Sequence, residues 1–445
     1  MRIIYLTAGA AGMYCGSCLH DNAIAKAFIR LGHDTILMPT YTPIQTDEQS
    51  AASNKLFFGG LNVYLQQLSP VFRWMPRWMD GVLSSPRLVN WVASRSMGTT
   101  ADKLGGLTVS MLRGAEGNQR KEVHRLCDWL ENEQPDVVVF SNLLIAGCVE
   151  EIKRRLKCPV VVVLQGDDIF YNGLHEPYKS QALEELRRLA GHVDRFIVHS
   201  ENYRQRMATM LKIDPVRVAV SPLSIDTADF DSLPTPAADQ GKPPSIGYLA
   251  RLAPEKGLHL LVDAFIEIAA IPGMEDVRLD IAGWLGPQNE GYWREQKEKL
   301  AAADLSDRYR YHGSVDRQGK LDLLSRIDVL CVPTTYEEPK GLFVLEGLAA
   351  GVPYVLPAHG AFPEMHDRHQ AGHLYSPSDE GELVQRLTEC MRQIEVTRQL
   401  GSDARKQLLL SAKTDGPMIE QEAREWLKVF EELQLAIPAD QHASN

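Results

Sequence analysis

Residues 328–357, DVLCVPTTYEEPKGLFVLEGLAAGVPYVLP, most constrain what this chain can fold into. An apolar, β-branched run at 328–333 and the start of a second at 354–356 are typical of buried parallel strands. Between them, residues 342–350 are good helix formers, and Gly351 and Pro353 end the helix. This order of strand, loop, helix and strand predicts an α/β fold with a parallel sheet.

The start of that helix is a candidate ligand site. A helix that begins at the carboxyl end of a strand points its unpaired N–H groups and partial positive charge into the crevice where open α/β sheets bind ligands. Gly341 precedes the helix and lets a phosphate approach the backbone closely. Glu338 and Glu346 flank the site, and because a carboxylate repels phosphate, we expect both to face neutral hydroxyls of a ribose and a sugar.

The segment EPKGL at 338–342, Glu346 and the sequence AAGVP at 349–353 together resemble the E-x7-E signature of retaining glycosyltransferases of family 4, which have the GT-B fold. The resemblance implies that Glu346 binds the ribose and that Glu338 lies by the donor sugar. It also implies that the amides of Gly341 and Leu342 meet the diphosphate. The family usually carries Phe where this chain has Lys340. For two glutamates taken alone, an ordinary amphipathic helix with solvated acids would be the alternative.

Three more sites in the second half of the chain match the family pattern. Arg251 and Lys256, in RLAPEKGLHLL, resemble its basic pair, and two cations in a βα turn would neutralise charge on a departing diphosphate. A solvated loop could hold the same pair. Gly283, His312 and Gly313 end two further predicted strands and match the family's base-binding edge.

The N-terminal residues predict a strand at 2–7, a helix at 18–31 and a strand at 34–38, joined by a glycine-rich turn. Gly9, Gly12 and Gly16 lack the G-x-G-x-x-G spacing of a dinucleotide site. The resemblance places this turn near the transferred sugar, and the alternative is that the glycines simply make the turn.

After the predicted strand at 160–164, related proteins often have a His that contacts the donor sugar. This chain has Gln165, and Asp167 is the nearest substitute. We expect Asp167 to bind a sugar hydroxyl or to cap a helix rather than to hold a metal ion.

Two features remain with competing interpretations. Cys15 and Cys18 form a C-x-x-C at a helix start, which could be a redox pair or, with His20, part of a metal site, but packing of a tight loop is favoured because a structural zinc site needs four ligands. Residues 71–95 interleave Trp and Arg, which suits peripheral membrane contact or a lipid-linked acceptor. A buried helix pair would look the same.

A length of 445 residues predicts two domains. We expect two Rossmann-like, doubly wound domains facing across a cleft: residues 1–230 with a returning helix at about 427–445, a proline-rich linker at 231–244, and a donor domain at 245–426. A net charge of −11 disfavours nucleic acid as a partner. The N-terminus shows no leader, no apolar run reaches membrane-spanning length, and seven scattered cysteines favour a reducing, cytoplasmic compartment, with any membrane contact at the inner face.

The resemblance therefore implies a metal-independent, cofactor-free transfer of a sugar from a nucleotide-diphosphate sugar to a glycan or lipid-linked hydroxyl, with retention of configuration. A GT-B epimerase or phosphorylase would reuse the same site, and product analysis separates them. A non-catalytic nucleotide-sugar sensor, switched by Cys15 and Cys18, is an alternative from another class.

Overall fold

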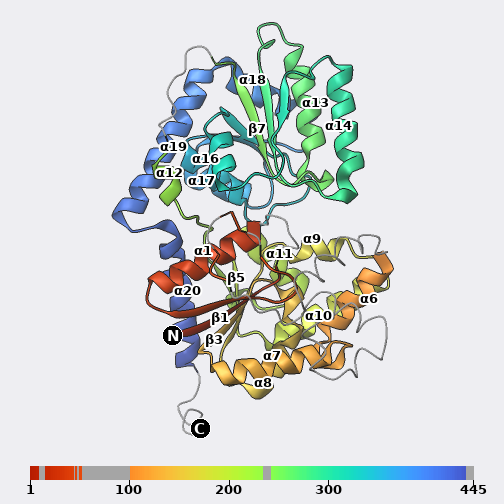
Figure 1. Cartoon of the computed structure of the whole chain (residues 1–445), viewed down its shortest axis with the longest axis vertical. Coiled ribbons are helices and arrows are strands. Elements are labelled where there is room, and N and C mark those ends of the chain that lie inside the picture. Colours follow the sequence, from red (N-terminus) through yellow and green to blue (C-terminus); the bar gives the residue numbers. More distant parts are fainter. Residues whose placement is uncertain (10–15, 45, 48–49, 53–100, 234–241, 437–445) are drawn as a thin grey trace. The chain divides into compact units, whose positions relative to one another are not determined.

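The computed structural model describes the chain except for residues 10–15, 45, 48–49, 53–100, 234–241 and 437–445 (Figure 1). It divides into two compact units, Met1–Pro222 with Glu422–Asn445, and Leu223–Gln421. The chain thus enters the second unit before the predicted linker at 231–244. The reason is that Phe230 is buried in the core of the second unit, where its carbonyl accepts a 2.7 Å hydrogen bond from Arg405. The chain also returns to the first unit at Glu422, before the predicted residue 427.

The first unit contains a parallel sheet whose strands, in spatial order, are β2 (Asp34–Pro39), β1 (Arg2–Thr7), β3 (Val137–Phe140), β4 (Val160–Val163), β5 (Arg195–Val198) and β6 (Val218–Val220). Its described α-helices are α1 (Gly16–Arg30), α6 (Ala101–Leu112), α7 (Arg120–Glu133), α8 (Val149–Arg155), α9 (Asp167–Asn172), α10 (Tyr178–His192), α11 (Glu201–Leu211) and most of α20 (Met418–Leu435). β3 and β4 read VVVF and VVVV, and every residue of both is buried. Such strands are covered by helices on both faces.

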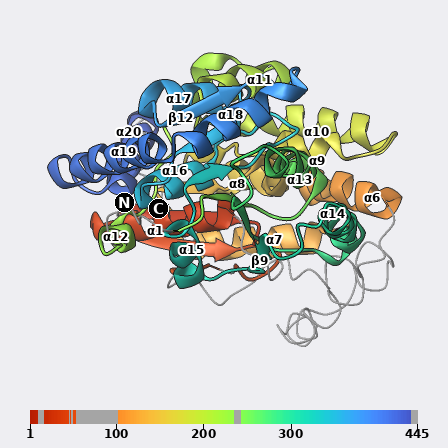
Figure 2. The ribbon, with the colours of Figure 1, turned by 90° about the horizontal axis from the view of Figure 1, so that it is seen from above.

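The second unit contains another parallel sheet, in the order β12 (Gly372–Tyr375), β11 (Tyr354–Pro357), β10 (Val329–Cys331), β7 (Ser245–Leu249), β8 (Arg278–Ala282) and β9 (Tyr309–Tyr311). Its α-helices are α12 (Ala228–Asp231), α13 (Leu258–Ala269), α14 (Glu290–Ala302), α15 (Arg317–Leu324), α16 (Leu342–Ala350), α17 (Phe362–His369), α18 (Glu380–Arg392) and α19 (Ile394–Thr414). α13 and α14 lie side by side (Figure 1 and Figure 2), and His259 of α13 meets Tyr292 of α14 at 3.0 Å. The predicted pair of doubly wound, parallel-sheet domains is confirmed.

Each sheet has one point where the strand order reverses. In the first sheet the chain runs from β1 to β2 and then continues on the other side of β1 with β3; in the second it runs from β7 through β9 and then continues on the other side of β7 with β10. The loops that leave the carboxyl ends of the two strands at such a switch point diverge, which opens a crevice for a ligand. The structure therefore predicts one crevice beside β1 and β3 and one beside β7 and β10.

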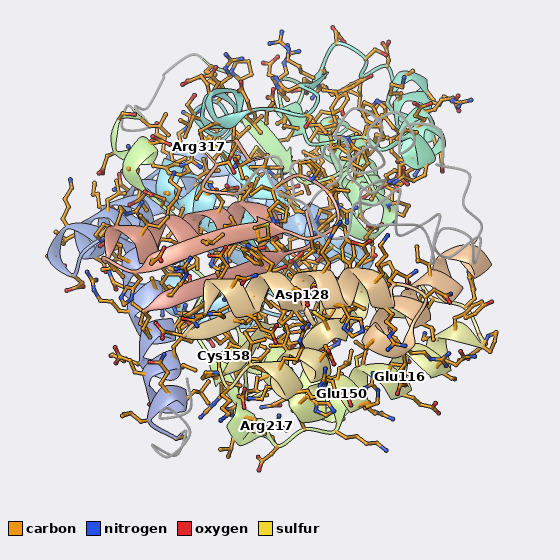
Figure 3. All side chains as sticks on the ribbon, turned by 60° about the horizontal axis from the view of Figure 1, so that its bottom comes forward. Glu116, Asp128, Glu150, Cys158, Arg217 and Arg317 are labelled. Carbon is orange, nitrogen blue, oxygen red and sulfur yellow. The ribbon has the colours of Figure 1, made fainter. Side chains whose placement is uncertain are left out.

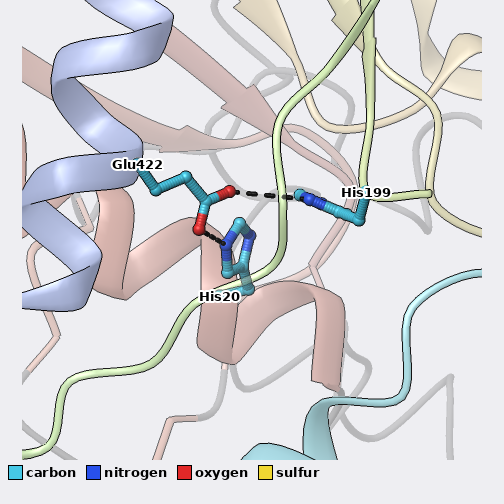
Figure 4. Close-up of side chains that lie close together, drawn as sticks. All are labelled: His20, His199 and Glu422. Carbon is cyan, nitrogen blue, oxygen red and sulfur yellow. Dashed lines mark hydrogen bonds and ion pairs between the residues drawn. The ribbon is translucent and has the colours of Figure 1, made fainter. Parts of the chain in front are cut away.

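A buried polar cluster fastens α20 to the rest of the first unit (Figure 4). Glu422 lies 3.1 Å from Nε2 of His20 on α1 and 3.5 Å from Nδ1 of His199, which follows β5. Two imidazoles and a carboxylate are a common metal-ligand set. However, Nδ1 of His199 is also 3.0 Å from the carbonyl oxygen of Ser221. A carbonyl only accepts, so this nitrogen carries a proton, and the lone pair of the neutral ring lies on Nε2.

Some of the acidic side chains that give the chain its net charge of −11 lie on the exposed faces of helices. Asp128 and Glu150 lie on α7 and α8 of the first unit (Figure 3). Asp128 accepts a 2.7 Å hydrogen bond from Arg155, and Glu150 pairs with Arg188. Pairs this exposed contribute about 0–1 kcal/mol each. Among the helices that the structure describes, none is both long and apolar enough to cross a membrane.

Candidate functional site

α16 begins at the carboxyl end of β10, after a loop that ends in Gly341. Gly341 has φ = 73°, and a Cβ built there would lie 3.0 Å from both Met365 Sδ and a ring carbon of Phe362. Glycine is therefore the residue that fits this turn with least strain. Within the described part of the chain, no side chain caps the helix, so the amides of Leu342 and Phe343 keep their capacity to bind an anion, whereas that of Val344 donates to the carbonyl of Gly341. The predicted helix at 342–350 is confirmed.

Glu338 is the centre of a compact polar triangle at this switch point. Its Oε2 accepts a 2.7 Å hydrogen bond from Nζ of Lys256, which follows β7, and a 2.5 Å bond from the hydroxyl of Tyr336. Lys256 also donates to the Tyr336 hydroxyl, and its Nζ lies 4.9 Å from the centroid of that ring. The side chains of Lys256 and Glu338 are only 14% and 7% exposed. Two residues predicted separately are thus brought together, and Tyr336 was not predicted.

The charge state of Glu338 is set by these neighbours. Burial alone would raise the pKa of its carboxyl, but the Lys256 ammonium, the Tyr336 hydroxyl and the charge of Lys340 together hold that pKa below its ordinary value. Burial and the Glu338 carboxylate raise the pKa of Tyr336 well above its usual range. Glu338 is therefore an anion and a weak base, while Tyr336 keeps its proton.

Glu346, on α16, is paired in the same way. Its Oε1 accepts a 2.6 Å hydrogen bond from Nζ of Lys320 on α15, and both side chains are buried. The sequence predicts that both acids face neutral hydroxyls, whereas in the structure each is paired with a lysine. No sequence motif marks Lys320. Its pairing with Glu346 follows from the packing of α15 against α16, which a local pattern does not report.

The other residues predicted for this unit lie at the same edge of the sheet. Arg251 follows β7 and pairs with Glu255 at 3.1 Å. Lys340 is 7% exposed. The amide of Gly283 donates a 2.9 Å hydrogen bond to the carbonyl of Gly313, and His312 lies 2.7 Å from Asp280. Their roles in binding remain predictions.

The first unit has a pocket of about 150 Å³ at its own switch point. Gly9, Gln165 and Asp167, all predicted for this side, line it, whereas Gly16 does not, and Gly12 lies outside the described residues. The lining also includes Thr7, Ala8, Ser17, Cys18, Asp21, Ser141, Asn142, Leu144 and Gly166. None of these described lining residues is Lys, Arg or His, so the described lining offers hydrogen-bonding groups without a positive charge.

The carboxylate of Asp167 is hydrogen-bonded to backbone amides of nearby residues. Its two oxygens accept hydrogen bonds from the amides of Leu143 at 2.6 Å and Gln165 at 3.1 Å. Burial raises the pKa of Asp167 to about 6, although these amides oppose the rise. Of the two roles predicted for it, this favours a local structural role of the capping kind over binding of a sugar hydroxyl. The side-chain amide of Gln165 likewise bonds to Asp21 at 3.1 Å and to the carbonyl of Ser141 at 2.7 Å.

Two further predictions fall mostly outside the described residues. Of the Cys15–Cys18 pair only Cys18 is described, and it is buried beside the pocket. The tryptophan- and arginine-rich segment at 71–95 is not described. A redox pair and a membrane surface therefore both stay predictions.

Comparisons with known proteins identify relatives of both units. A family model for glycosyl transferases group 1 matches residues 229–407, and one for glycosyltransferase family 4 matches residues 107–229. The phosphatidyl-myo-inositol mannosyltransferase of Mycobacterium leprae is 31% identical over 31% of this chain and 34% of its own length. The D-inositol 3-phosphate glycosyltransferase of Kineococcus radiotolerans is 29% identical over 38% and 40%. The matched stretch is thus less than half of either relative.

Solved structures extend the likeness of fold to nearly the whole chain. Sucrose-phosphate synthase from Thermosynechococcus elongatus superposes with a TM-score of 0.68 at 18% identity, over 97% of this chain and 100% of that one. Anabaena HepE in complex with UDP and glucose superposes with a TM-score of 0.65 at 18% identity, over 96% and 99%. At such identities the likeness concerns the fold alone.

Proposed function

The chain belongs to the group 1 glycosyl transferases and has their GT-B fold, and from this premise we propose that it transfers a sugar from a nucleoside diphosphate sugar to a hydroxyl of an acceptor, with retention of anomeric configuration. The observation that carries the proposal is the Lys256–Glu338–Tyr336 triangle beside the free amides of α16. Cations and helix amides at a switch point suit a diphosphate, and buried carboxylates within the same loop suit sugar hydroxyls.

In the proposed reaction the second unit holds the donor. Lys256, Arg251 and the amides at the start of α16 stabilise the negative charge that develops on the leaving diphosphate. Glu346, fixed by Lys320, accepts hydrogen bonds from the ribose hydroxyls, and Glu338 accepts them from the sugar. Because these side chains provide the positive charge, the proposal needs no divalent cation.

The acceptor proton goes to the leaving phosphate oxygen. Glu338 is a poor candidate for a general base, since its pKa is held below the ordinary value, and a base works best with a pKa near the operating pH. Glu346 is engaged by Lys320. Attack on the same face that the diphosphate leaves then retains the anomeric configuration.

The pocket of the first unit is the proposed acceptor site. Its lining is polar without a described cation, which suits a polyol or a sugar hydroxyl. The two relatives named above act, by their names, on inositol-containing compounds, one of them a lipid. We propose a glycan or lipid-linked acceptor, and co-sedimentation with anionic liposomes at low salt tests whether residues 71–95 contact a membrane; failure to co-sediment would remove that part.

The donor is found by thermal-shift screening with UDP-, GDP- and ADP-sugars, because a ligand that binds only the folded state raises the melting temperature. The donor that stabilises the protein is then incubated with candidate acceptors, and NMR of the product reports the anomeric configuration. Glu346→Ala should raise the donor KM at least tenfold. An inverted product, an epimerised sugar, or phosphate consumption would contradict the proposal, as would a donor that binds without turnover on any acceptor.

A further inference from the structure

Tyr336 occupies a position that the proposed reaction has not yet used. Its hydroxyl donates to Glu338 at 2.5 Å and accepts from Lys256, so it touches one side chain assigned to the diphosphate and one assigned to the sugar. Tyr336 and Glu338 belong to the loop after β10, whereas Lys256 comes from the loop after β7. The tyrosine thus bridges the loops on the two sides of the switch point.

The direction of each hydrogen bond is fixed by chemistry. Lys256 has three protons and no acceptor, so it donates to both partners. Tyr336 stays protonated and has one proton, which goes to the carboxylate, because Glu338 only accepts. The donor and the acceptor of each of the three hydrogen bonds in the triangle are therefore assigned.

This arrangement occupies most of the carboxylate. Oε2 of Glu338 accepts two hydrogen bonds, and Oε1 accepts a long one of 3.4 Å from the amide of Gly341. An ionised carboxylate offers about four lone-pair positions, so one remains, on Oε1. While Lys256 stays in place, Glu338 has little capacity left for sugar hydroxyls.

A diphosphate changes this balance. It carries more negative charge than one carboxylate, and the flexible four-carbon stem of Lys256 allows its ammonium to turn toward phosphate. When Lys256 moves, Oε2 regains a lone pair, while the Tyr336 hydrogen bond keeps the carboxylate in its orientation. Glu338 then binds the sugar hydroxyls with its full capacity only after the diphosphate is bound.

We propose that Tyr336 is a positioning residue that couples recognition of the diphosphate to recognition of the sugar, by holding Glu338 in place when Lys256 leaves it. The inference rests on the proposed function, because it requires a nucleoside diphosphate sugar at this site. Tyr336 lies outside the E-x7-E pattern, and on this proposal it determines that the diphosphate is recognised before the sugar.

UDP, GDP, ADP and their glucose and mannose esters are first screened for the nucleoside diphosphate and sugar ester that stabilise the protein best. Calorimetry then measures the affinity of the protein for that nucleoside diphosphate and for its sugar ester. In Tyr336→Phe, which keeps the ring, affinity for the nucleoside diphosphate should change less than threefold, and the additional affinity gained from the sugar should fall about tenfold, the effect of one hydrogen bond to a charged group. Tyr354→Phe is the matched control, since Tyr354 is a buried tyrosine of the same unit whose hydroxyl contacts His366 at 3.2 Å instead.

An equal loss for both ligands would show a merely structural tyrosine and overturn the proposal, and so would no loss for either. A second measurement needs no substitution: free glucose or mannose should bind the unsubstituted protein detectably only when the nucleoside diphosphate is present. Equal sugar binding with and without it would also overturn the coupling. If no nucleoside diphosphate or sugar ester binds the unsubstituted protein, the proposed function itself fails, and this inference fails with it.

Discussion

The switch points of the two units have the same topology, but they place a buried carboxylate in opposite electrostatic environments. Beside β7 and β10, the buried carboxylate of Glu338 is paired with a lysine, and its pKa lies below the ordinary value. Beside β1 and β3, the buried carboxylate of Asp167 has backbone amides as its partners, and its pKa rises to about 6. The same chemical group is thus stabilised as an anion in one unit and pushed toward neutrality in the other.

This difference fits the two ligands that we propose for the two units. A crevice with buried cations compensates an anionic ligand, so the second unit suits the diphosphate. A crevice without a described cation makes no such provision and suits neutral hydroxyls. Topology determines where each crevice lies, and the side chains in the loops after the strands determine what it binds.

Lys256→Met should have the largest effect, because it removes the cation that distinguishes the switch point of the second unit from that of the first. The change leaves Glu338 buried without its ammonium partner, and loss of one member of a buried pair costs about 3–5 kcal/mol. It also removes a cation from the leaving group, so turnover should fall at least 100-fold. Urea unfolding and steady-state kinetics measure the two effects.

The control is Lys299→Met in the same unit. Lys299 donates to Asp263 at 2.7 Å, but these side chains are 35% and 48% exposed. The expected cost is below about 1 kcal/mol, with no change in turnover. If both lysine variants lose equal stability, the pair at the switch point is not special.

A smaller effect is expected from Lys320→Met. Glu346 would lose its 2.6 Å partner, so its buried carboxylate would be held less firmly in the orientation that meets the ribose hydroxyls. The donor KM should rise about tenfold with kcat changed less, and steady-state kinetics at varied donor concentration measure both. The double variant Lys320→Met/Glu346→Gln removes the unpaired buried charge, so it should regain stability relative to the single variant without regaining the donor KM. An unchanged donor KM in the single variant would contradict the assigned role.

Local patterns predicted the fold well because they report local causes. The helix at 342–350 has its predicted bounds, since a glycine at each end fixes where helical backbone begins and stops. The strand at 2–7 likewise has its predicted bounds. The pairing of side chains was not predicted, because it depends on which strands become neighbours.

Lys256 and Glu338 illustrate this limit. Each was predicted from its own loop, but their ion pair follows from the placement of β10 beside β7, which no local pattern specifies. Lys320 and Tyr336 carried no motif at all. Gly12, Cys15 and the segment at 71–95 lie outside the described residues, so their predictions remain open.

The comparison can be sharpened by measuring stability against pH. The folded pKa of Glu338 is below its unfolded value of 4.5, so its contribution to stability is present above that pH and is lost as the pH falls through the folded pKa. For Asp167 the folded pKa of about 6 exceeds the unfolded 3.8, so stability falls as the pH rises between these values, by about 3 kcal/mol in all.

The two neutral variants should therefore respond in opposite ways. Relative to the unsubstituted protein, Asp167→Asn should gain about 2 kcal/mol of unfolding free energy between pH 4 and pH 7. The unfolding free energy of Glu338→Gln should instead fall, relative to that of the unsubstituted protein, as the pH rises from the acid side through 4.5. Urea unfolding at a series of pH values measures both differences, and parallel curves for the two variants would refute the opposite pKa shifts.

The smallest effect concerns the turn before α16. Gly341→Ala must hold an alanine at φ = 73° and fit a Cβ 3.0 Å from Met365 and Phe362, both of which are side chains that can yield. We expect a loss of about 1–2 kcal/mol in stability, together with a higher donor KM, because a shifted turn displaces the amides that meet the diphosphate. Gly273→Ala is the control for strain, since Gly273 has φ = 86° and no atom within 4 Å of the added Cβ. It should lose similar stability and leave the donor KM unchanged. Equal donor KM values for the two alanine variants would mean that the turn does not position the phosphate-binding amides.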